Sequence, residues 1–401
     1  MAEDPSFTSF LQKLTNLEKT RFFNAFQNYT LTKLEEVLDY FKLNRDEINR
    51  EKLIRISVVG TNGKGSTSHF ISQLALMSGK FKNVGLYTSP HLESYLERIQ
   101  INSEFISENW LDNKLKNLSR QEKSLIGELS YFELLTLMSI LFFHESKCDI
   151  EVYEAGLGGR LDATKLVSSD YVVLTNVGLD HTEILGSSRE KILIEKLNII
   201  SDYTKHIIHT IDKTDPIFPV LEKFCKNNRV EPSYYRLVNS RDYLDNNKKL
   251  AYFAFNKILK MEKIPESRNK TYSENLIPPP GRIETLREDA SVIFDIGHNP
   301  AGIKMFLHSV SLRYPQKDWV FYFACLKDKD GRAMLEEALQ YKKIKEIKLV
   351  LGPDFQKEIP GFYNLQNIQL SDLVTVLQNE KENILIAGTF RLYEYAKKAF
   401  P

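Results

Sequence analysis

A glycine-rich segment in the first quarter of the chain has the residue types of a phosphate-binding loop. It reads GTNGKGST over residues 60–67, directly after the apolar run 54–59 and directly before apolar residues at helical spacing. In such a strand, loop and helix, glycines let backbone N–H groups surround phosphate oxygens, and the helix N-terminus adds partial positive charge. Lys64 can reach the terminal phosphates, and Ser66 or Thr67 can offer a hydroxyl to Mg²⁺. The segment predicts an ATP site formed by Gly60, Thr61, Asn62, Gly63, Lys64, Gly65, Ser66 and Thr67.

Acidic and histidine residues follow two further apolar runs. Glu154 ends the run 149–154 and precedes a glycine-rich turn, whereas Asp180 and His181 come shortly after the run 171–176. Open α/β sheets bind ligands beyond the carboxyl ends of their strands, so we expect these side chains in a cleft. The Glu154 carboxylate would suit Mg²⁺. A histidine at a strand end is about as often a structural hydrogen-bonding residue, because the hard Mg²⁺ ion prefers oxygen.

The elements that carry these residues alternate as in a parallel sheet covered by helices. Predicted strands of the first part are residues 54–59, 84–89, 149–154, 171–176 and 206–211. Predicted helices of this part are residues 66–77, 131–145 and 189–201. After a break, the alternation resumes with strands at 291–296, 319–324, 344–352 and 383–388 and helices at 301–313, 331–341 and 390–400. The predicted fold class is therefore α/β with two sheets.

The break between the two parts is the polar segment 267–282, which contains three consecutive prolines and a glycine. Neither a helix nor a central strand tolerates this composition. The 401 residues exceed the ~250–300 at which a single core stops growing, so two domains are expected. We predict a P-loop ATPase-like parallel-sheet domain with an N-terminal helical arm at residues 1–275, and a smaller Rossmann-like α/β domain at residues 280–401. Residues 212–263 receive no chemical assignment.

The overall charge and the cysteines argue against several classes of partner. The 54 basic and 53 acidic residues give a net charge of +1, which favours neither nucleic acid nor an anionic membrane as a partner. Cys148, Cys225 and Cys325 are widely spaced, which favours a reducing, cytoplasmic location over a disulfide framework. The acidic N-terminus lacks the pattern of an export signal. Residues 132–143, the most apolar stretch, are about half the ~20 residues of a membrane span and should form a buried helix.

The glycine-rich loop differs from the common GxxxxGKS pattern, because two residues separate Gly60 from Gly63 and Gly65 follows Lys64. This string resembles the phosphate loop of the folylpolyglutamate and dihydrofolate synthases, members of the Mur ligase superfamily. The alternative is a tight turn whose glycines serve the backbone only. Further motifs of the family follow in order: TSPHL at 88–92, ERI at 97–99, EAGLGGRLDAT at 154–164, TNVGLDHTEILG at 175–186, the pair at 195–196, PGRIE at 280–284, FDIGHNPAG at 294–302 and KDKD at 327–330. The resemblance covers about the whole chain outside the N-terminal arm and residues 212–263.

The resemblance implies a metal and phosphate site in the first domain. The ligands of Mg²⁺ would be Ser66, Ser89, Glu154, His181 and Lys196. Lys196 lies where the family has a lysine that carbon dioxide can carbamylate, which replaces a cation by an anion with two oxygens. Leu197 and Asn198 stand where the family continues with Ala-Gly, and a solvated surface lysine is the alternative. The expected catalytic residues are Lys64, His181 and Lys196.

In the second domain the resemblance implies nucleotide contacts from Arg282, Asp295, His298 and Asn299. Guanidinium geometry suits phosphate, and a linker turn would explain the proline and glycine beside Arg282 but not the arginine. The family's Asp-Gly-Ala-His-Asn-Pro reads Asp-Ile-Gly-His-Asn-Pro here, with the polar positions kept. We expect these residues to face the nucleotide across a cleft between the domains.

The acceptor would bind at Pro90, His91, Tyr131 and Phe132, since flat rings stack on a heteroaromatic group. The two aromatic residues are equally expected in a buried core.

The implied reaction is the ATP-dependent ligation of L-glutamate to dihydropteroate, to a (poly)glutamylated tetrahydrofolate, or to both, through an acyl phosphate. ATP and Mg²⁺ are the implied cofactors, and a monomer is expected. Two alternatives remain. A cell-wall Mur-type amino-acid ligase usually has a further N-terminal domain for a nucleotide sugar, whereas about 50 residues precede the loop here. An ATP-hydrolysing switch would explain the loop, but it would leave Glu154, His181 and Lys196 without a shared purpose.

Overall fold

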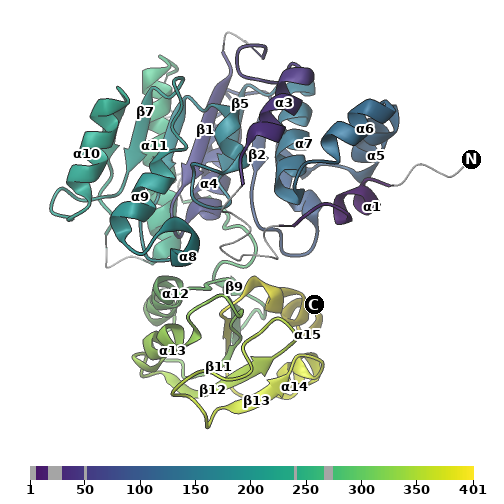
Figure 1. Cartoon of the computed structure of the whole chain (residues 1–401). Helices are drawn as coiled ribbons and strands as arrows, with labels where there is room; N and C mark the ends of the chain where they lie inside the picture. Colours follow the sequence, from purple (N-terminus) through teal and green to yellow (C-terminus); the bar gives the residue numbers. More distant parts are fainter. Residues whose placement is uncertain (1–5, 17–28, 49–51, 239–241, 266–273) are drawn as a thin grey trace, which may run out of the picture. The chain divides into compact units, whose positions relative to one another are not determined.

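The computed structural model describes residues 6–16, 29–48, 52–238, 242–265 and 274–401. The chain forms two compact units (Figure 1): Met1–Leu237 with Asn247–Ile277, and Val238–Asn246 with Pro278–Pro401. The division after Ile277 falls within the proline-containing segment 267–282. Residues 267–273 of that segment, and residues 1–5 of the acidic N-terminus, lie outside the described residues. The sequence prediction did not anticipate that Val238–Asn246 joins the second unit, because only tertiary contacts place these residues there.

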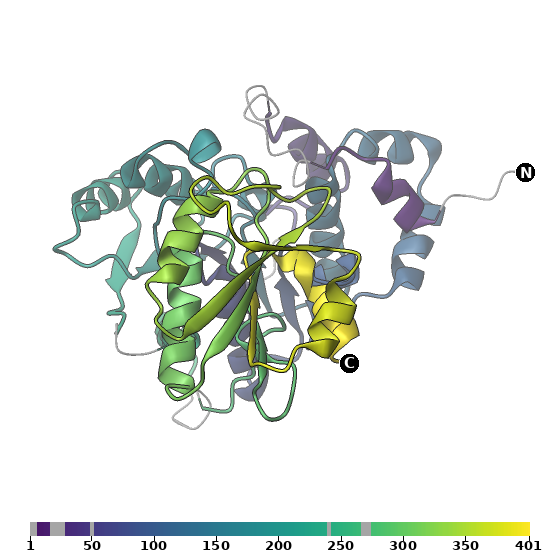
Figure 2. The ribbon, with the colours of Figure 1, turned by 90° about the horizontal axis from the view of Figure 1, so that it is seen from below.

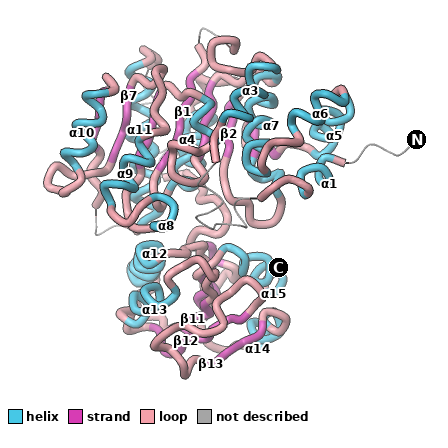
Figure 3. Tube along the Cα trace, in the orientation of Figure 1, coloured by secondary structure: helices cyan, strands magenta, loops and turns pink. Residues whose placement is uncertain are grey.

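An eight-stranded sheet forms the centre of the first unit, in the order β4-β3-β2-β5-β1-β6-β7-β8. Its strands are β1 (Ile54–Val59), β2 (Val84–Tyr87), β3 (Ile99–Ile101), β4 (Glu104–Phe105), β5 (Ile150–Glu154), β6 (Tyr171–Leu174), β7 (His206–His209) and β8 (Glu231–Tyr234). Neighbours from β2 to β8 are parallel, and β3 and β4 extend one edge as antiparallel strands. The central strands β1, β5 and β6 are buried along their whole length, as expected where helices cover both faces. Figure 3 shows these strands in magenta among the cyan helices.

The register of the central strands aligns the ends that carry the predicted site. Val58 of β1 pairs with Glu154 of β5 and with Val173 of β6. The carboxyl ends of three parallel neighbours therefore lie at one edge of the sheet. The segments that follow them, which are far apart in the sequence, begin side by side for this reason.

Helices surround this sheet. They are α1 (Phe7–Gln12), α3 (Thr32–Tyr40), α4 (Lys64–Met77), α5 (Glu108–Asn117), α6 (Arg120–Ile126), α7 (Tyr131–Glu145), α8 (Thr182–Leu185), α9 (Arg189–Leu197), α10 (Phe218–Asn227) and α11 (Tyr243–Met261), with 3₁₀ helices η1 (Tyr95–Arg98) and η2 (Ala163–Val167). Helix α4 packs on β1, β2 and β5. One apolar cluster joins α1, α3, α5 and α7, and a second joins α9 and α10 to β6. Helix α7 has its predicted bounds, and a capping box formed by Ser130 and Glu133 fixes its start.

The second unit contains a six-stranded sheet in the order β13-β12-β11-β14-β10-β9. Its elements are β9 (Glu284–Thr285), β10 (Val292–Phe294), α12 (Pro300–Arg313), β11 (Trp319–Phe323), α13 (Gly331–Leu339), β12 (Ile344–Leu351), β13 (Gln366–Gln369), α14 (Leu373–Asn379), β14 (Ile384–Ala387), η4 (Phe390–Leu392) and α15 (Tyr393–Ala399). Neighbouring strands are parallel except β9 and β10. Figure 2 shows the green helices α12 and α13 on one side of this sheet and the yellow helices α14 and α15 on the other.

The predicted α/β class with two sheets is confirmed, and each predicted strand is present with ends that differ by at most two residues. The strands that the prediction omitted, β3, β4, β8, β9 and β13, lie at or next to sheet edges, where burial does not impose an apolar pattern. Cys148, Cys225 and Cys325 are buried, and none of the three forms a disulfide bond within the described residues. In the part of the chain that the structure describes, no helix is both long and apolar enough to cross a membrane.

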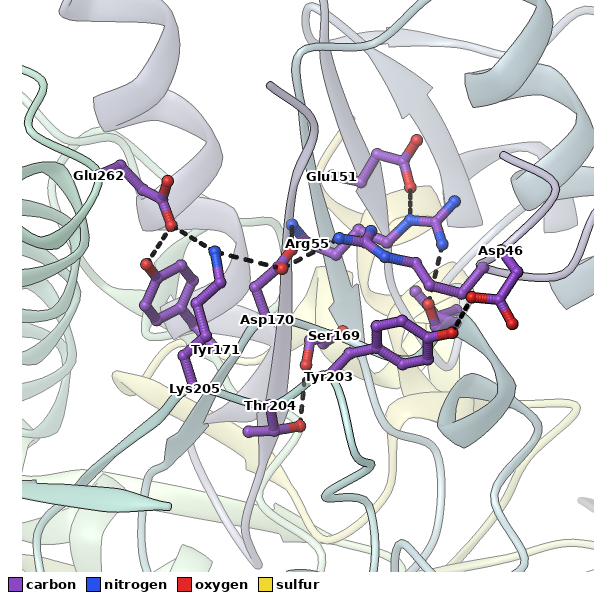
Figure 4. Close-up of polar contacts among 12 residues, drawn as sticks. Asp46, Arg55, Glu151, Ser169, Asp170, Tyr171, Tyr203, Thr204, Lys205 and Glu262 are labelled. Carbon is purple, nitrogen blue, oxygen red and sulfur yellow. Dashed lines mark hydrogen bonds and ion pairs between the residues drawn. The ribbon is translucent and has the colours of Figure 1, made fainter. Parts of the chain in front are cut away.

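A buried polar network connects the central strands at their amino-terminal ends, the ends away from the predicted site (Figure 4). Arg55 of β1 donates from Nε to Glu151 Oε2 on β5 at 2.8 Å and from Nη1 to the Val167 carbonyl at 2.9 Å. The Arg55 backbone N–H donates to Asp170 Oδ2 at 2.9 Å, and Arg45 Nη2 donates to both oxygens of that carboxylate at 3.0 Å. Buried charges persist only when they are paired and hydrogen-bonded, and these contacts pair the charges of β1, β5 and the segment before β6.

Candidate active site

The phosphate loop connects β1 to α4, and contacts with the segment after β6 hold its shape. The Thr61 N–H donates to the Asn176 carbonyl at 3.0 Å, and the Asn62 N–H donates to Asn176 Oδ1 at 2.9 Å. Gly63, the residue before α4, has φ of 84°, in the left-handed region that favours glycine. At Gly60, a side chain would place its Cβ only 1.9 Å from Thr175 Oγ1. Both glycines are therefore required by the backbone and its close neighbours.

Hydroxyl groups in the first turns of α4 are buried and lack a protein partner. The side-chain oxygens of Ser66, Thr67 and Ser68 have no hydrogen-bond partner among the described residues. An unpaired buried polar group destabilises a fold by about 1–3 kcal/mol. Hydroxyls that persist in this state at a helix N-terminus, beside a glycine-rich loop, are suited to a phosphate or a metal ligand.

Glu154 and Ser89 lie beside the same helix start. The Ser89 N–H donates to Glu154 Oε2 at 3.0 Å, and both residues are buried. A side chain at Gly65 would place its Cβ 3.1 Å from Glu154 Oε2. The structure therefore brings a carboxylate, the TSPHL loop and the start of α4 together.

Lys196 is buried against the phosphate loop, which contradicts the alternative of a solvated surface lysine. Its side chain is near the end of α9, and Nζ donates to the Gly60 carbonyl at 2.8 Å. Burial lowers the pKa of Lys196 to about 7, with a further reduction from the Lys64 charge and a partial offset from Asp180 and Asp162. A substantial fraction of this amine is therefore neutral near neutral pH.

His181 stands at the turn into α8 with φ of 49°. Its backbone N–H donates to Asp180 Oδ1 at 2.9 Å, and its Nε2 lies 3.8 Å from the same oxygen. This arrangement is compatible with a structural histidine and with a metal ligand. Within the described ranges, no three His, Cys, Asp or Glu side chains gather as a metal site. The predicted set would thus need hydroxyls and a modified Lys196 in addition to Glu154 and His181.

The residues predicted to bind the acceptor substrate lie in the first unit, in the TSPHL loop and at the start of α7. Tyr131 and Phe132 are both half-buried and pack against the cluster around α7. The Phe132 ring lies against the glycine-rich turn after β5, because a Cβ at Gly156 would be 2.9 Å from its Cζ. Pro90, after a cis peptide bond with Ser89, precedes His91 in the TSPHL loop.

Two buried residues of this region were not assigned from the sequence. Arg98 Nε donates to His91 Nδ1 at 2.9 Å, and the Arg98 guanidinium lies over the Tyr131 ring at 5.5 Å. Asp162 accepts the Leu157 N–H at 2.8 Å and the Thr164 hydroxyl at 2.6 Å, and burial raises its pKa. Arg98 and Asp162 stand within the quoted motifs ERI and GRLDAT, which is the signal that could have found them.

In the second unit, Asp295 follows β10 and is buried. Its Oδ1 accepts the Gly297 N–H at 2.8 Å, and its Oδ2 accepts the Ile283 N–H at 2.9 Å and the Tyr243 hydroxyl. Burial raises the pKa of Asp295, and these donors and the charge of Arg282 oppose that shift. The carboxylate is thus held in one orientation.

The other predicted residues of this unit have different surroundings. Asn299 caps α12, since its Oδ1 accepts the Gly302 N–H at 2.7 Å, which gives it a structural role. His298 Nδ1 lies 3.1 Å from the Ile296 carbonyl. Arg282 Nη1 donates to the Gly281 carbonyl at 3.4 Å.

Asn247 is a further candidate that the sequence interpretation missed. It lies on α11, in the segment that received no chemical assignment, and its side chain is buried. A Cβ at Gly63 would be 2.8 Å from Asn247 Oδ1, and Asn247 Nδ2 has no hydrogen-bond partner among the described residues. An amide donor without a protein partner beside the glycine-rich loop makes Asn247 a candidate for a ligand contact. Only the folded structure, in which α11 lies beside the loop, reveals this residue.

Comparison with known proteins places this chain in a class. Residues 58–276 match the family model of the Mur ligase middle domain, and residues 281–362 match that of the Mur ligase, glutamate ligase domain. The first match covers more than half of the chain. The class is therefore that of the Mur-type ligases.

Two curated relatives specify the family within this class. The dihydrofolate synthase/folylpolyglutamate synthase of Buchnera aphidicola from Schizaphis graminum is 32% identical over 83% of this chain and 85% of its own length. The protein of the same name from the Acyrthosiphon pisum strain is 36% identical over 52% of this chain, and the match spans 47% of that relative. The chain belongs to the dihydrofolate synthase/folylpolyglutamate synthase family.

A solved structure agrees with this assignment at the level of the fold. A bifunctional folylpolyglutamate synthase/dihydrofolate synthase with Mn, AMPPNP and L-glutamate bound is 22% identical, with a TM-score of 0.76 over 96% of both chains.

Proposed function

We propose that this protein is an ATP-dependent ligase that joins the amine of L-glutamate to the carboxylate of dihydropteroate, of a reduced folate, or of both. The observation that carries the proposal is the convergence at one loop of unpaired buried hydroxyls, the Glu154 carboxylate and the low-pKa Lys196 amine. The names of the relatives and the AMPPNP, Mn and L-glutamate bound to the solved family member support it.

The chemistry follows from the low reactivity of a carboxylate toward amines. An acceptor carboxylate oxygen attacks the γ-phosphorus of ATP, the bond to the β-phosphate oxygen breaks, and an acyl phosphate and ADP form. The glutamate amine then attacks the acyl carbon, loses a proton, and phosphate leaves as the amide forms. Lys64 and the N–H groups of the loop would neutralise the charge that develops on the transferred phosphoryl group. Catalysis on this scheme is mainly positioning and electrostatics.

The donor set fits a hard divalent cation. Ser66 or Thr67, Ser89, Glu154 and His181 would hold Mg²⁺, together with a carbamate on Lys196. The ion would supply charge neutralisation at the phosphates. In forming the carbamate, the neutral Lys196 amine adds to carbon dioxide and releases a proton, giving an N-carboxylate. A pKa of about 7 leaves enough neutral amine for that addition near neutral pH.

The second unit would contribute to nucleotide binding through Arg282, Asp295 and His298. Both carboxylate oxygens of Asp295 are held by backbone donors, which is the preorganisation that a ligand contact requires. The acceptor would lie near His91, Tyr131 and Phe132. A cytoplasmic location and a monomeric state complete the proposal, the first because three buried thiols suit a reducing compartment.

Product analysis by mass spectrometry tests the function. The purified protein is incubated with Mg-ATP and L-glutamate plus dihydropteroate, tetrahydrofolate or a nucleotide-linked peptide, and each substrate is omitted in turn. A glutamyl product that requires ATP, glutamate and the acceptor supports ligation. ATP hydrolysis that neither substrate affects would instead identify an ATPase switch, and product only with a nucleotide-linked peptide would identify a cell-wall ligase. Asp295→Ala should lose activity if the second unit contributes.

A further inference from the structure

The first turn of helix α11 belongs to the second unit and is fixed on α12. Tyr243 N–H donates to Ser309 Oγ at 3.1 Å, and Asp242 Oδ2 accepts two hydrogen bonds from Arg313, the shorter at 2.9 Å. Asp242 Oδ1 also accepts the Asp245 N–H at 2.8 Å, which caps the helix start. The position of the Tyr243 backbone is thus determined by contacts on both sides of the residue.

From this position the Tyr243 side chain reaches Asp295. Its hydroxyl donates to Asp295 Oδ2, which also accepts the Ile283 N–H. Desolvation and the adjacent carboxylate hold the pKa of Tyr243 well above its usual value, so the phenol remains a donor. Asp295 itself is 3% exposed.

Most hydrogen-bond acceptor positions of the Asp295 carboxylate are already occupied. An ionised carboxylate has about four acceptor positions on its two oxygens. Oδ2 receives the Ile283 N–H and the Tyr243 hydroxyl, and Oδ1 receives the Gly297 N–H. About one position is left, on Oδ1. These three donors come from three different segments, so the carboxylate cannot rotate without breaking at least one of the three hydrogen bonds.

We propose that Tyr243 is a positioning residue for nucleotide binding, which holds the Asp295 carboxylate so that its remaining acceptor position on Oδ1 faces a donor group of the nucleotide. The inference rests on the proposed function, in which Asp295 contacts the nucleotide. It adds a residue from the segment 212–263, where the sequence indicated no chemistry. Tyr243 contributes orientation and does not itself touch a reacting group.

The second unit contains a matched control. Tyr322 is a buried tyrosine whose hydroxyl donates to Glu380 Oε2 at 2.8 Å, a carboxylate that has no part in the proposed site. Tyr243→Phe and Tyr322→Phe each remove one hydroxyl from a carboxylate and keep the ring. A purely structural role would give both variants the same kinetic behaviour.

The experiment compares wild type, Tyr243→Phe, Tyr322→Phe and Asp295→Asn in the full-length protein. The measurements are kcat and KM for ATP, the affinity for Mg-AMPPNP by calorimetry, and the melting temperature. For Tyr243→Phe we expect about a tenfold increase in KM for ATP and in the AMPPNP dissociation constant, the size of one displaced charged hydrogen bond, with kcat within about twofold. Tyr322→Phe should leave both constants unchanged.

The outcomes separate the inference from the function on which it rests. If Asp295→Asn weakens AMPPNP binding but Tyr243→Phe does not, the positioning role is wrong and the proposed function stands. If the two tyrosine variants weaken binding equally, the role of Tyr243 is only structural. If neither Asp295→Asn nor Tyr243→Phe affects AMPPNP binding, the nucleotide role of Asp295 fails, and the inference fails with it.

Discussion

Lys196 Nζ donates a 2.8 Å hydrogen bond to the carbonyl oxygen of Gly60, which joins the end of helix α9 to the first residue of the phosphate loop. The lysine is buried, and its pKa is lowered to about 7. This contact anchors the Lys196 amine at the start of the phosphate loop.

The carbamate hypothesis predicts chemical rescue of one variant. Lys196→Ala should lose ligation activity, and added acetate or formate should restore part of it, because a small carboxylate offers oxygens to Mg²⁺ in the vacated space. Rates of glutamyl product formation with and without acetate measure the effect. Lys64→Ala is the control that acetate should not rescue, since it lacks a cation. Absence of both rescue and a carbamate mass increment in bicarbonate would refute the hypothesis.

The lowered pKa of Lys196 also predicts a pH-dependent stability. Between pH about 7 and 10.5 the amine is neutral in the folded protein and protonated in the unfolded chain. The unfolded state then binds one more proton, so the free energy of unfolding should rise with pH across this window, by at most about 1.4 kcal/mol per pH unit. Lys196→Met should lack this slope. Urea unfolding of both proteins in bicarbonate-free buffer at pH 7, 8 and 9 tests it, and parallel pH profiles would contradict it.

Lys64 should be needed for turnover and not for folding. Lys64→Ala removes a half-buried cation whose Nζ donates one long hydrogen bond, 3.4 Å, to the Thr61 carbonyl, so little of the fold depends on it. We expect ligation to fall by ~10²-fold or more, the usual effect of losing a preorganised electrostatic contact, with an unchanged melting temperature. Activity within about twofold of wild type would remove the basis for the phosphate-loop assignment.

Asn247, whose side chain occupies the space beside Gly63, should contribute to nucleotide affinity through its amide. Asn247→Ala removes a buried amide beside the loop, and we expect KM for ATP to rise by about tenfold, as for loss of one hydrogen bond to a charged ligand. Asn256→Ala is a control on the same helix, where Asn256 Nδ2 donates to the Tyr252 carbonyl at 3.0 Å. Equal effects of both substitutions on KM would show that α11 acts only as a scaffold.

The Arg55–Glu151 pair should affect stability without affecting substrate affinity. Removing one partner of a buried ion pair leaves an uncompensated charge and typically destabilises a protein by about 3–5 kcal/mol. We therefore expect Glu151→Leu to lower the free energy of unfolding by that amount, and Arg55→Met combined with Glu151→Leu to recover much of it. Chemical denaturation measures both. A single variant that raises KM for ATP while retaining wild-type stability would contradict this role.

The features that could be predicted from the sequence are formed by residues that are close together in the chain. A strand, a glycine-rich loop and a helix are adjacent in sequence, so residues 54–77 predict both their own structure and a phosphate-binding role. Parallel strands place their carboxyl ends at one edge, so the sequence also predicts that Glu154 lies in the cleft beyond the strand ends. The cytoplasmic location and the monomeric state remain predictions.

By itself, the sequence determined the α/β class, the central strands and the glycine-rich connection between β1 and α4, because periodicity and glycine spacing are local properties. The tertiary structure alone decided the environments of individual side chains. Burial in the fold, together with the nearby Lys64 charge, lowers the pKa of Lys196 to about 7. Tyr243 and Asn247 lie in a segment without a chemical motif, and they acquire candidate roles only where α11 brings them to Asp295 and to Gly63. Desolvation and hydrogen-bond direction depend on neighbours distant in the chain, and residue spacing does not record them.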